Sequence, residues 1–417
     1  MDLISLLVLV ATIAIAFAFK LNTGIVALAA SLILSLATGT PEKLLTGSFD
    51  GKLFLTLLGV MYLFSIAQEN KTLELLAKKV FALCKGNRKI LPIVIFLFAA
   101  VISAVGPGLI SVTALVSVLL VALAKEMDTP PIRLIPFGMM GAFAGGLSPI
   151  TPSGIVAITK AAEQGITGIE NSMPWMMALT CVIYAIILYF FAAKWHKEKK
   201  AAPATDGSRL SAPTPAFTPK QIITLAGIVA VAVVSSVFSL NVGLVAFAVA
   251  VILTLCKVAD EGAALKKVPW GTLIMITGVG ILISLVTELG GIKLLSDGLL
   301  SLSNSITVAP ITALVSGIMS WFSSASGVVM PTMIKTVPNM TQAFPGANAV
   351  ELVNCISIGA NMAAISPLSS CGGLMLAAYT ASGDISLKDR NKMFLQLFLL
   401  SAGAVALTAL CALIGIY

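Results

Sequence analysis

The amino-acid sequence predicts an all-α polytopic membrane protein with two inverted-topology repeats, each containing five spans plus a re-entrant helical hairpin. The composition, the long apolar blocks and an internal repeat lead to this prediction. Hydrophobic residues make up 58% of the 417 residues and charged residues only 11%, whereas soluble domains are typically about 45–50% apolar and about 25% charged. The composition therefore excludes a soluble enzyme, a nucleic-acid-binding protein and a disordered chain.

The net charge, the cysteines and the single histidine show which kinds of binding site the chain does not offer. The net charge of +8 matches the excess of lysine and arginine in cytoplasmic loops of membrane proteins, so we do not interpret it as a nucleic-acid-binding surface. The six cysteines lie in or beside apolar segments without a C-x-x-C pair, as small buried side chains do. The only histidine, His196, lies in a basic loop, which excludes a histidine metal site or proton relay. We expect no cofactor.

Ten apolar segments approach the roughly 20 residues that a helix needs to span a bilayer. The segment nearest the N-terminus, Leu3–Phe19, is followed by neither a cleavage site nor a polar stretch, so we expect a spanning helix and not a removed signal peptide. The candidate spans are Leu3–Phe19, Thr23–Thr38, Leu53–Ala67, Leu134–Thr159, Trp175–Ala193, Ile222–Leu240, Val242–Cys256, Gly271–Val286, Val353–Ala381 and Phe394–Ile416.

Two more apolar regions, residues 90–125 and 306–338, are too long for one span. Each is interrupted in its middle by small, polar, Gly or Pro residues, at Ser103–Gly108 and at Ser320–Gly327. Each region could be two full spans or one re-entrant hairpin, and the charges of the flanking loops give the same sidedness for both.

Residues 194–220 form the predicted linker between the two halves of the chain. This segment is rich in Ala, Pro, Ser and Thr and carries four closely spaced lysines and Arg209, as linkers often do. Because basic loops stay in the cytoplasm, we expect the linker to be cytoplasmic. Counting spans from it places both termini outside.

An internal repeat indicates a duplication. The segment Leu-Asn-Thr-Gly-Ile-Val-Ala-Leu-Ala at 21–29 recurs as Leu-Asn-Val-Gly-Leu-Val-Ala-Phe-Ala at 240–248, an offset of 219 residues. A Ser-Pro pair at 148–149 recurs at 366–367, an offset of 218. The near-constant offset predicts a first repeat over residues 1–193 and a second over residues 221–417.

The number of crossings per repeat predicts how the repeats are related. Each repeat crosses an odd number of times, whether its hairpin region is re-entrant or consists of two full spans. The second repeat then begins on the opposite side of the membrane. This inverted-topology arrangement is common in secondary transporters.

The apolar pattern breaks at four places, at the two hairpin centres and inside the broken spans of residues 134–160 and 352–382. Pro149 and Pro152 cannot both lie in an unbroken helix, because each removes a backbone donor and clashes with the preceding turn. Freed carbonyls and Ser or Thr hydroxyls suit a Na⁺ ion, whereas half-helix N-termini suit an anion. The alternative is a Pro-kinked helix whose serines bond back to the preceding turn.

The charged residues bear on the coupling ion. None of the 18 Asp and Glu residues lies in the middle of a candidate span, and an intramembrane proton carrier normally needs a buried carboxylate or histidine. We therefore expect a cation held by neutral oxygens. Lys335 is the basic residue nearest to the breaks, and its alternative interpretation is a lysine that snorkels to the interface. Asn361, one turn before the second break, is the strongest side-chain amide there and a candidate site residue.

At these residues the chain resembles the ion transporter superfamily that includes the divalent-anion/sodium symporters, and within it the MatC-type dicarboxylate (malonate) carriers. The likeness rests on the Leu21–Gly24 start, the Val105–Gly108 tip and the Ile365–Gly373 segment, and it covers essentially the whole chain. It implies a homodimer with a fixed scaffold and a transport domain that moves like an elevator. It also implies Na⁺ sites at the hairpin tips and a di-anion between them. Such symporters carry Ser-Asn-Thr at both tips, whereas neither tip here contains asparagine.

The breaks and the resemblance together give two sets of candidate site residues. The expected Na⁺ ligands are Ser103, Gly106, Ser148, Ser323, Ser324 and Ser366. The expected substrate-binding residues are Pro107, Gly108, Thr151, Pro152, Ser153, Ser326, Gly327, Asn361, Ser369 and Ser370.

The sequence thus predicts a secondary active transporter in the cell (inner) membrane that imports a small carboxylate, a C3–C4 dicarboxylate above all, with Na⁺ as coupling ion. Its partners are then the carboxylate, Na⁺ and the lipid bilayer. The alternative is a proton-coupled or antiporting carrier of another organic or inorganic anion. An intramembrane enzyme would need a nucleophile or a metal constellation, and the sequence offers none. A channel is a third option, which conductance and non-saturating uptake would distinguish.

Overall fold

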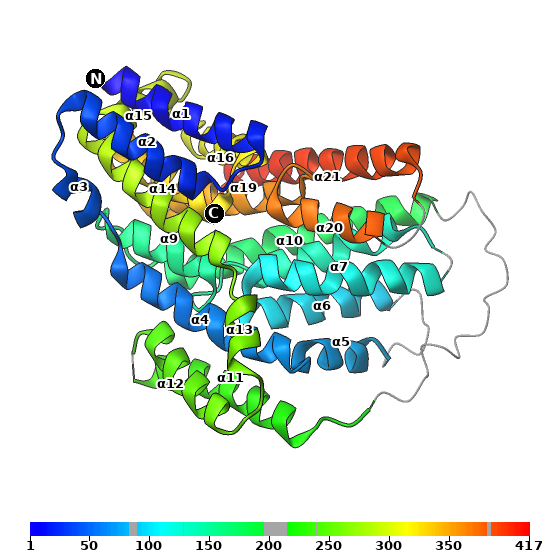
Figure 1. The fold of residues 1–417 in the computed structure, drawn as a ribbon. Coiled ribbons are helices and arrows are strands. Elements are labelled where there is room, and N and C mark those ends of the chain that lie inside the picture. Colours follow the sequence, from blue (N-terminus) through cyan, green and yellow to red (C-terminus); the bar gives the residue numbers. More distant parts are fainter. Residues whose placement is uncertain (83–89, 128, 196–214, 239, 382–384) are drawn as a thin grey trace.

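The computed structural model describes residues 1–82, 90–127, 129–195, 215–238, 240–381 and 385–417. Among these residues all regular secondary structure is helical, with short 3₁₀ and π turns and no β-strand. Helices that are far apart in the sequence lie side by side, as α10, α19 and α21 do (Figure 1). The predicted all-α fold is confirmed.

The first half of the chain contains ten α-helices within the described residues. They are α1 (Asp2–Phe19), α2 (Thr23–Thr38), α3 (Glu42–Gly47), α4 (Gly51–Glu69), α5 (Thr72–Ala82), α6 (Leu91–Ala104), α7 (Gly108–Glu126), α8 (Ile135–Gly145), α9 (Pro152–Ala162) and α10 (Ile169–Trp195).

The second half contains eleven α-helices in its described part. They are α11 (Pro219–Val237), α12 (Val242–Leu255), α13 (Glu261–Lys267), α14 (Trp270–Glu288), α15 (Gly291–Ser301), α16 (Val308–Phe322), α17 (Met330–Met333), α18 (Val337–Ala343), α19 (Ala349–Met362), α20 (Ser370–Ala381) and α21 (Leu387–Leu413).

Several helices are long and apolar enough to cross a membrane. Among the described residues there are six such helices, or up to seven if α16 and residues 325–343, which bend by 119°, form one span. Other apolar helices, such as α2, α6, α8 and α12, have 11–16 residues, and at about 1.5 Å per residue they are shorter than the roughly 30 Å hydrocarbon core. The chain is therefore a multi-pass membrane protein in which full-length and short helices are combined.

Most predicted spans agree with the helices, and the differences lie at helix ends, as in α10 and α21, and in short helices. Helix α2 covers the predicted Thr23–Thr38. Helix α10 begins at Ile169, earlier than the predicted Trp175, and contains Pro174 near its start. Helices α5 and α15, of 11 residues each, were not predicted, because their apolar residues alternate with lysine, serine, aspartate or glutamate.

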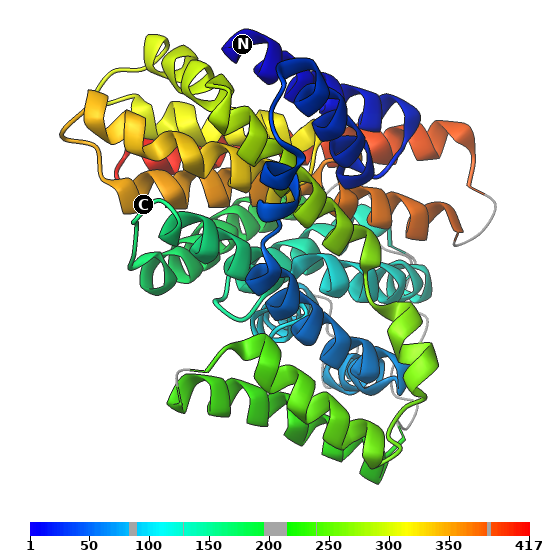
Figure 2. The ribbon, with the colours of Figure 1, turned by 60° about the vertical axis from the view of Figure 1, so that its left-hand side comes forward.

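The two halves interlock through two pairs of crossing helices. Helix α2 packs on α14, and α12 packs on α4. Figure 2 shows α4 and α14 in the middle of the molecule, with α1–α2 on one side and α11–α12 on the other. Each pair therefore joins a helix of the first half to a helix of the second.

Glycines at equivalent positions allow these helices to touch backbone to backbone. A Cβ atom on Gly59 would lie 2.1 Å from the carbonyl oxygen of Gly243, and one on Gly278 would lie 2.4 Å from that of Gly24. Gly243 follows Gly24 by 219 residues, and Gly278 follows Gly59 by the same number. Residues that are equivalent in the sequence repeat thus make equivalent contacts.

The hairpin arms pack against the broken spans in the same paired manner. Helix α6 packs on α8 and α16 on α19, while α7 packs on α20 and α9 on the π turn Ala325–Val329 and on α17. Gly141 of α8 and Gly359 of α19 allow close approach, because a Cβ would lie 2.2 Å from the Phe96 carbonyl oxygen and 2.4 Å from that of Ala313. The four breaks therefore lie within one packed core.

We predict that Gly278→Ala destabilises the protein because the added Cβ meets a backbone carbonyl that cannot rotate away. Overpacking of this kind costs about 1–3 kcal/mol. Thermal unfolding of the detergent-purified protein should show a lower midpoint than the wild type.

Gly298→Ala is the matched control, because nothing lies within 4 Å of a Cβ at that exposed helical position. A helical Gly→Ala change without a clash adds up to about 1 kcal/mol of helix propensity. Equal midpoints for the two variants would contradict the importance of the glycine crossing.

Candidate functional site

In each of the two broken spans, one helix ends and a new helix begins a few residues later. Helix α8 ends at Gly145 and α9 begins at Pro152; α19 continues through the 3₁₀ turn Ala363–Ile365, and α20 begins at Ser370. The residues before the new helices are Thr151, in extended conformation, and Ser369. These two residues are 218 positions apart in the sequence.

The hydroxyls of Thr151 and Ser369 satisfy the backbone freed by each break. Thr151 Oγ1 lies 2.7 Å from the carbonyl oxygens of residues 146 and 148 and accepts a hydrogen bond from the Gly154 amide at 3.2 Å. Ser369 Oγ lies 2.7 and 2.8 Å from the carbonyl oxygens of residues 364 and 366. Because both hydroxyls are bonded to backbone, they hold the break in shape and are not free for a ligand in this conformation.

The first hairpin tip rests on the first break. Residues 105–107 connect α6 to α7, and Gly108 has a φ of +72°, which favours glycine. A Cβ on Gly108 would lie 2.9 Å from Cδ of Pro152. The predicted residue Gly108 is thus adjacent to Thr151 and Pro152, at the N-terminus of α9, and the predicted Pro107 directly precedes it in the chain.

Ser103, in the last turn of α6, is the polar side chain under this tip. It is fully buried, and its hydroxyl has no hydrogen-bond partner among the described residues. Buried hydroxyls are normally paired with protein, water or an ion. Ser148 and Ser153 flank the break, half-buried and buried respectively, while Gly106 packs against the ring of Phe64.

The second hairpin tip is shaped by its own serines. Ser323 Oγ donates to the Met319 carbonyl oxygen at 2.8 Å, and Ser324 Oγ accepts from the Gly327 amide at 3.1 Å. The π turn that follows contains Ser326, which is only 4% exposed. Gly327 packs on Met275 of α14. The first half reaches this tip through α9, which packs along the π turn.

Asn361 lies beneath the return arm of the second hairpin. Its Nδ2 donates to the Ser357 carbonyl oxygen at 2.7 Å and lies 3.8 Å from Sδ of Met330. Its Oδ1 and the Ser357 hydroxyl are buried without a partner in the described structure. An unpaired buried polar group costs about 1–3 kcal/mol, so these two oxygens are suited to a cation or a donor that enters between α19 and the hairpin.

The predicted residues therefore form two groups. The first, around the N-terminus of α9, joins the first tip to the first break; the second joins the second tip to α14 and to Asn361. Ser366, Ser369 and Ser370 lie at the start of α20, which packs on α7 of the first hairpin.

The structure also shows a charged cluster that sequence reasoning missed. Lys160 of α9 is 8% exposed, and its Nζ lies 3.1 Å from Oδ2 of Asp50 and also contacts the Glu163 carboxylate. Together with Lys335 these residues line a pocket of about 240 Å³. The spacing of Lys160 and Glu163 on one helix face was visible in the sequence, whereas Asp50 is 110 residues away.

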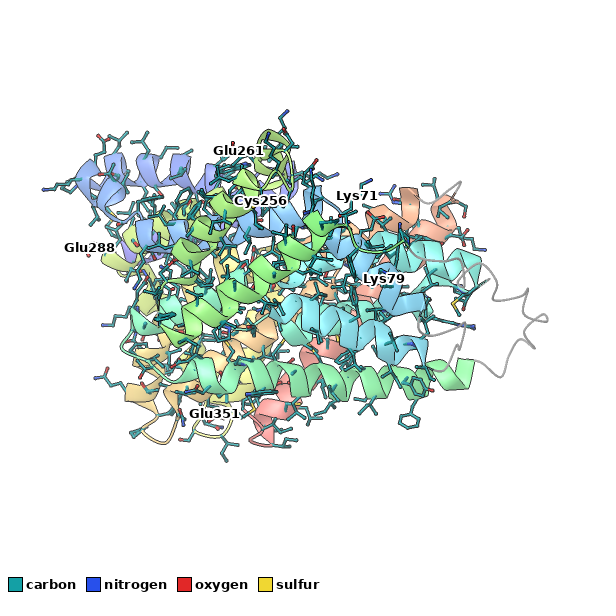
Figure 3. The ribbon with its side chains drawn as sticks, turned by 90° about the horizontal axis from the view of Figure 1, so that it is seen from below. Lys71, Lys79, Cys256, Glu261, Glu288 and Glu351 are labelled. Carbon is teal, nitrogen blue, oxygen red and sulfur yellow. The ribbon has the colours of Figure 1, made fainter. Side chains whose placement is uncertain are left out.

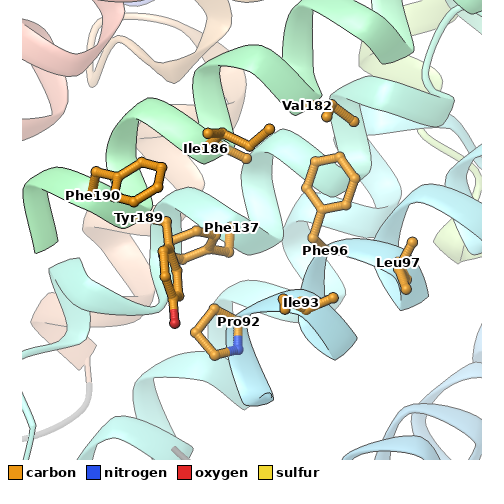
Figure 4. A pocket seen from close by; sticks show the side chains of 10 residues that line it. Pro92, Ile93, Phe96, Leu97, Phe137, Val182, Ile186, Tyr189 and Phe190 are labelled. Carbon is orange, nitrogen blue, oxygen red and sulfur yellow. The ribbon is translucent and has the colours of Figure 1, made fainter. Parts of the chain in front are cut away.

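A second, larger hollow is apolar. It has a volume of about 450 Å³ and lies between α6, α8 and α10, lined by residues such as Phe96, Phe137 and Phe190. Figure 4 shows the hydroxyl of Tyr189 as the one side-chain oxygen among the lining residues. Such a surface suits hydrocarbon and offers no charge to a carboxylate.

We predict that Thr151→Val lowers stability even without a ligand, because it leaves the Gly146 carbonyl and the Gly154 amide at the break without their partner. The expected loss is about 1–2 kcal/mol, measured by thermal unfolding in substrate-free buffer. Thr151→Ser keeps the hydroxyl and should unfold near the wild-type temperature. A Thr151→Val protein with wild-type stability would show that the hydroxyl is not needed as a helix cap.

Two solved structures share this fold over most of their length. The Alcanivorax borkumensis YdaH transporter, whose crystal structure is described as having an unusual topology, matches with a TM-score of 0.59 at 12% identity, over 89% of this chain and 87% of that chain. Neisseria gonorrhoeae MtrF, described among a class of antimetabolite efflux pumps, matches with a TM-score of 0.56 at 14% identity, over 91% of this chain and 84% of that chain. At such low identities the likeness shows the fold alone.

Comparison with family models gives the identity at the level of the family. No curated protein matches the chain significantly. The model of the citrate transporter family, CitMHS, matches residues 7–359, which include both hairpins and the first break. The chain is a transporter and not an enzyme, and it belongs to the CitMHS family of citrate transporters.

Proposed function

We propose that the protein is a Na⁺-coupled importer of a small carboxylate that works by an elevator-type alternating-access mechanism. A C3–C4 dicarboxylate is the expected substrate, as in the MatC-type carriers that the sequence resembles. The family description suggests citrate as the second carboxylate to test. The observation that carries the proposal is the pair of equally capped helix breaks, packed with two hairpins in one core.

An inverted-topology duplication accounts for the paired contacts. In Figure 1, α5, which precedes the first hairpin, and α15, which precedes the second, lie toward opposite ends of the bundle. Helix α6 has 14 residues and α16 has 15, or roughly 21–23 Å at 1.5 Å per residue. Arms of this length that enter from opposite sides and end near the middle favour re-entrant hairpins over pairs of full spans.

The sidedness follows from the lysines. Figure 3 places Lys71 and Lys79 toward one end of the bundle and Glu288 toward the other. Because cytoplasmic loops are enriched in lysine and arginine, we assign the α5 end to the cytoplasm. The predicted linker at 194–220 lies mostly outside the described residues, and its cytoplasmic location stays a prediction. The N-terminus and α15 then lie outside, as does the C-terminus.

Neutral oxygens would bind Na⁺, and helix N-termini would bind the anion. The proposed Na⁺ ligands remain Ser103, Gly106, Ser148, Ser323, Ser324 and Ser366. Support for them comes from the unpartnered hydroxyl of Ser103. The anion is proposed to lie at the N-termini of α9 and α20, where the helix dipole is positive, with Asn361 on the inner side.

The scaffold of the elevator is proposed to include α1–α2 and α11–α12. These helices carry many large hydrophobic side chains that are exposed in the single chain, among them Ile33, Leu36, Phe238 and Leu255. Lipid or a second copy of the chain could cover them, and we propose a homodimer, as the resemblance implies. The packed core with both hairpins would then be the part that moves.

We predict that proteoliposomes take up a labelled C3–C4 dicarboxylate only when a Na⁺ gradient is directed inward. Initial rates should saturate with substrate concentration and fall to the level of empty vesicles when choline replaces Na⁺. Citrate should be tested in parallel under the same gradients.

The outcome also separates the alternatives. Equal uptake with choline and Na⁺ would overturn the Na⁺ coupling, and a rise in lumen pH during that uptake would favour a proton-coupled carrier. Conductance with uptake that does not saturate would indicate a channel. Absence of uptake for every carboxylate would overturn the substrate class.

A further inference from the structure

A polar pocket of about 240 Å³ lies beside the second hairpin, away from the helix breaks. Its walls come from the α3–α4 connection, the end of α9, one face of α14 and the return arm that contains Pro331 and Lys335. Figure 1 shows α3 and α9 at the end of the bundle that holds the N-terminus. On the sidedness proposed above, this end faces the outside, where an importer first meets its substrate.

The charge of Lys160 in this pocket is more than balanced, because two carboxylates contact its one ammonium group. Its side chain is 10% exposed and sits between the carboxylates of Asp50 and Glu163. Asp50 is held in place, because its Oδ1 also accepts a hydrogen bond from the Leu53 amide at 2.9 Å. Lys160 therefore has little charge to offer to an incoming anion, and its ion pairs tie α9 to the start of α4.

The hydroxyls in the pocket wall are also engaged. Ser48, Thr277 and Ser284 donate to carbonyl oxygens of the preceding turn at 2.7, 2.8 and 3.0 Å. Their protons point into their own helices. Among the residues that line the pocket, these hydroxyls do not add donors for an anion.

Lys335 differs from every other donor in the pocket. No carboxylate of the described residues lies within 4 Å of its Nζ, and its one hydrogen bond goes to the Thr287 hydroxyl at 3.3 Å. An ammonium group has three donors, so Lys335 can offer two more. It is half-buried, and partial exclusion of water strengthens the attraction between opposite charges.

We propose that this pocket is an outer recruitment site for the carboxylate substrate and that Lys335 is the residue that binds one of its carboxylate groups. The proposal rests on the proposed carboxylate transport. Lys335 follows Gly327 by eight positions on the same return arm, roughly 12 Å along a helix. An anion bound at Lys335 is therefore outside the tip and break region and precedes binding there.

The position of Lys335 also connects recruitment to the hairpin. The pocket is bounded by the hairpin on one side and by α14 and the α3–α4 connection on the other. A carboxylate held there contacts the return arm before it reaches the tip. An interfacial lysine with a purely structural role would have no reason to respond to substrate.

The test compares Lys335→Gln and Lys335→Arg in reconstituted vesicles, with initial uptake of succinate and of citrate as the readouts. We expect Lys335→Gln to raise KM roughly 10- to 100-fold, the loss of one charge-assisted hydrogen bond, while kcat stays near the wild-type value. Lys335→Arg keeps the charge and should recover most of the affinity. The KM of the wild type should rise with ionic strength at constant Na⁺, and that of Lys335→Gln should not.

Lys293→Gln is the matched control, because Lys293 is an exposed lysine on α15 that does not line the pocket. It should behave as the wild type in KM and in salt dependence. A Lys335→Gln protein with wild-type KM, or an arginine variant as impaired as the glutamine variant, would overturn the proposal.

Binding without transport provides the independent measurement. Succinate and citrate should raise the unfolding temperature of the purified wild type, since a ligand that binds only the folded state stabilises it, and the shift should be smaller for Lys335→Gln. If wild-type vesicles take up no carboxylate, the proposed function fails, whereas uptake with equal KM and equal thermal shifts for both proteins defeats only the recruitment site.

Discussion

Backbone hydrogen bonding inside the membrane is the constraint on which the rest of the structure depends. In hydrocarbon an unpaired amide or carbonyl costs several kcal/mol, so non-helical backbone survives only where protein or a water-filled cavity surrounds it. Thr151 and Ser369 meet this condition at the two breaks, where the one hydroxyl proton of each lies between two carbonyl oxygens. Because the breaks are capped and enclosed, two helices can begin within the packed core, with their positive N-terminal ends inside it.

Features that depend on neighbours along the chain could be predicted from the sequence. The helix at Thr23–Thr38 follows from an apolar run that begins after Asn22, whose side chain accepts a hydrogen bond from the Gly24 amide. The breaks follow from closely spaced prolines and glycines. Helices α5 and α15 could not be recognised, because short amphipathic helices resemble loops when only apolar length is counted. The contact between α9 and the second hairpin tip depends on packing between the halves, which one sequence does not reveal.

The candidate site likewise combines features that the local sequence predicts with features that only the folded chain reveals. The sequence placed Thr151 and Ser369 at the breaks, but it could not tell whether their hydroxyls face a ligand or their own backbone. Lys160 stood at a predicted span end, and its partner Asp50 comes from a distant connection. Two lysines of one pocket thus differ in their direct contacts: Lys160 lies between two carboxylates, whereas the one hydrogen bond of Lys335 among the described residues goes to a hydroxyl. Residue type alone does not decide which of them is available to bind an anion.

The glycine crossings have a consequence for biosynthesis. The partner of α2 is α14, and Trp270 at the start of α14 comes 232 residues after Thr38 at the end of α2. At synthesis rates of about 5–20 residues per second, α2 waits roughly 10–50 s in the membrane with its glycine face uncovered. Helix α4 likewise waits for α12. The first half can insert, but it completes its packing only when the second half arrives, so a ribosome that stalls in the linker leaves two unpartnered helix surfaces for quality control to recognise.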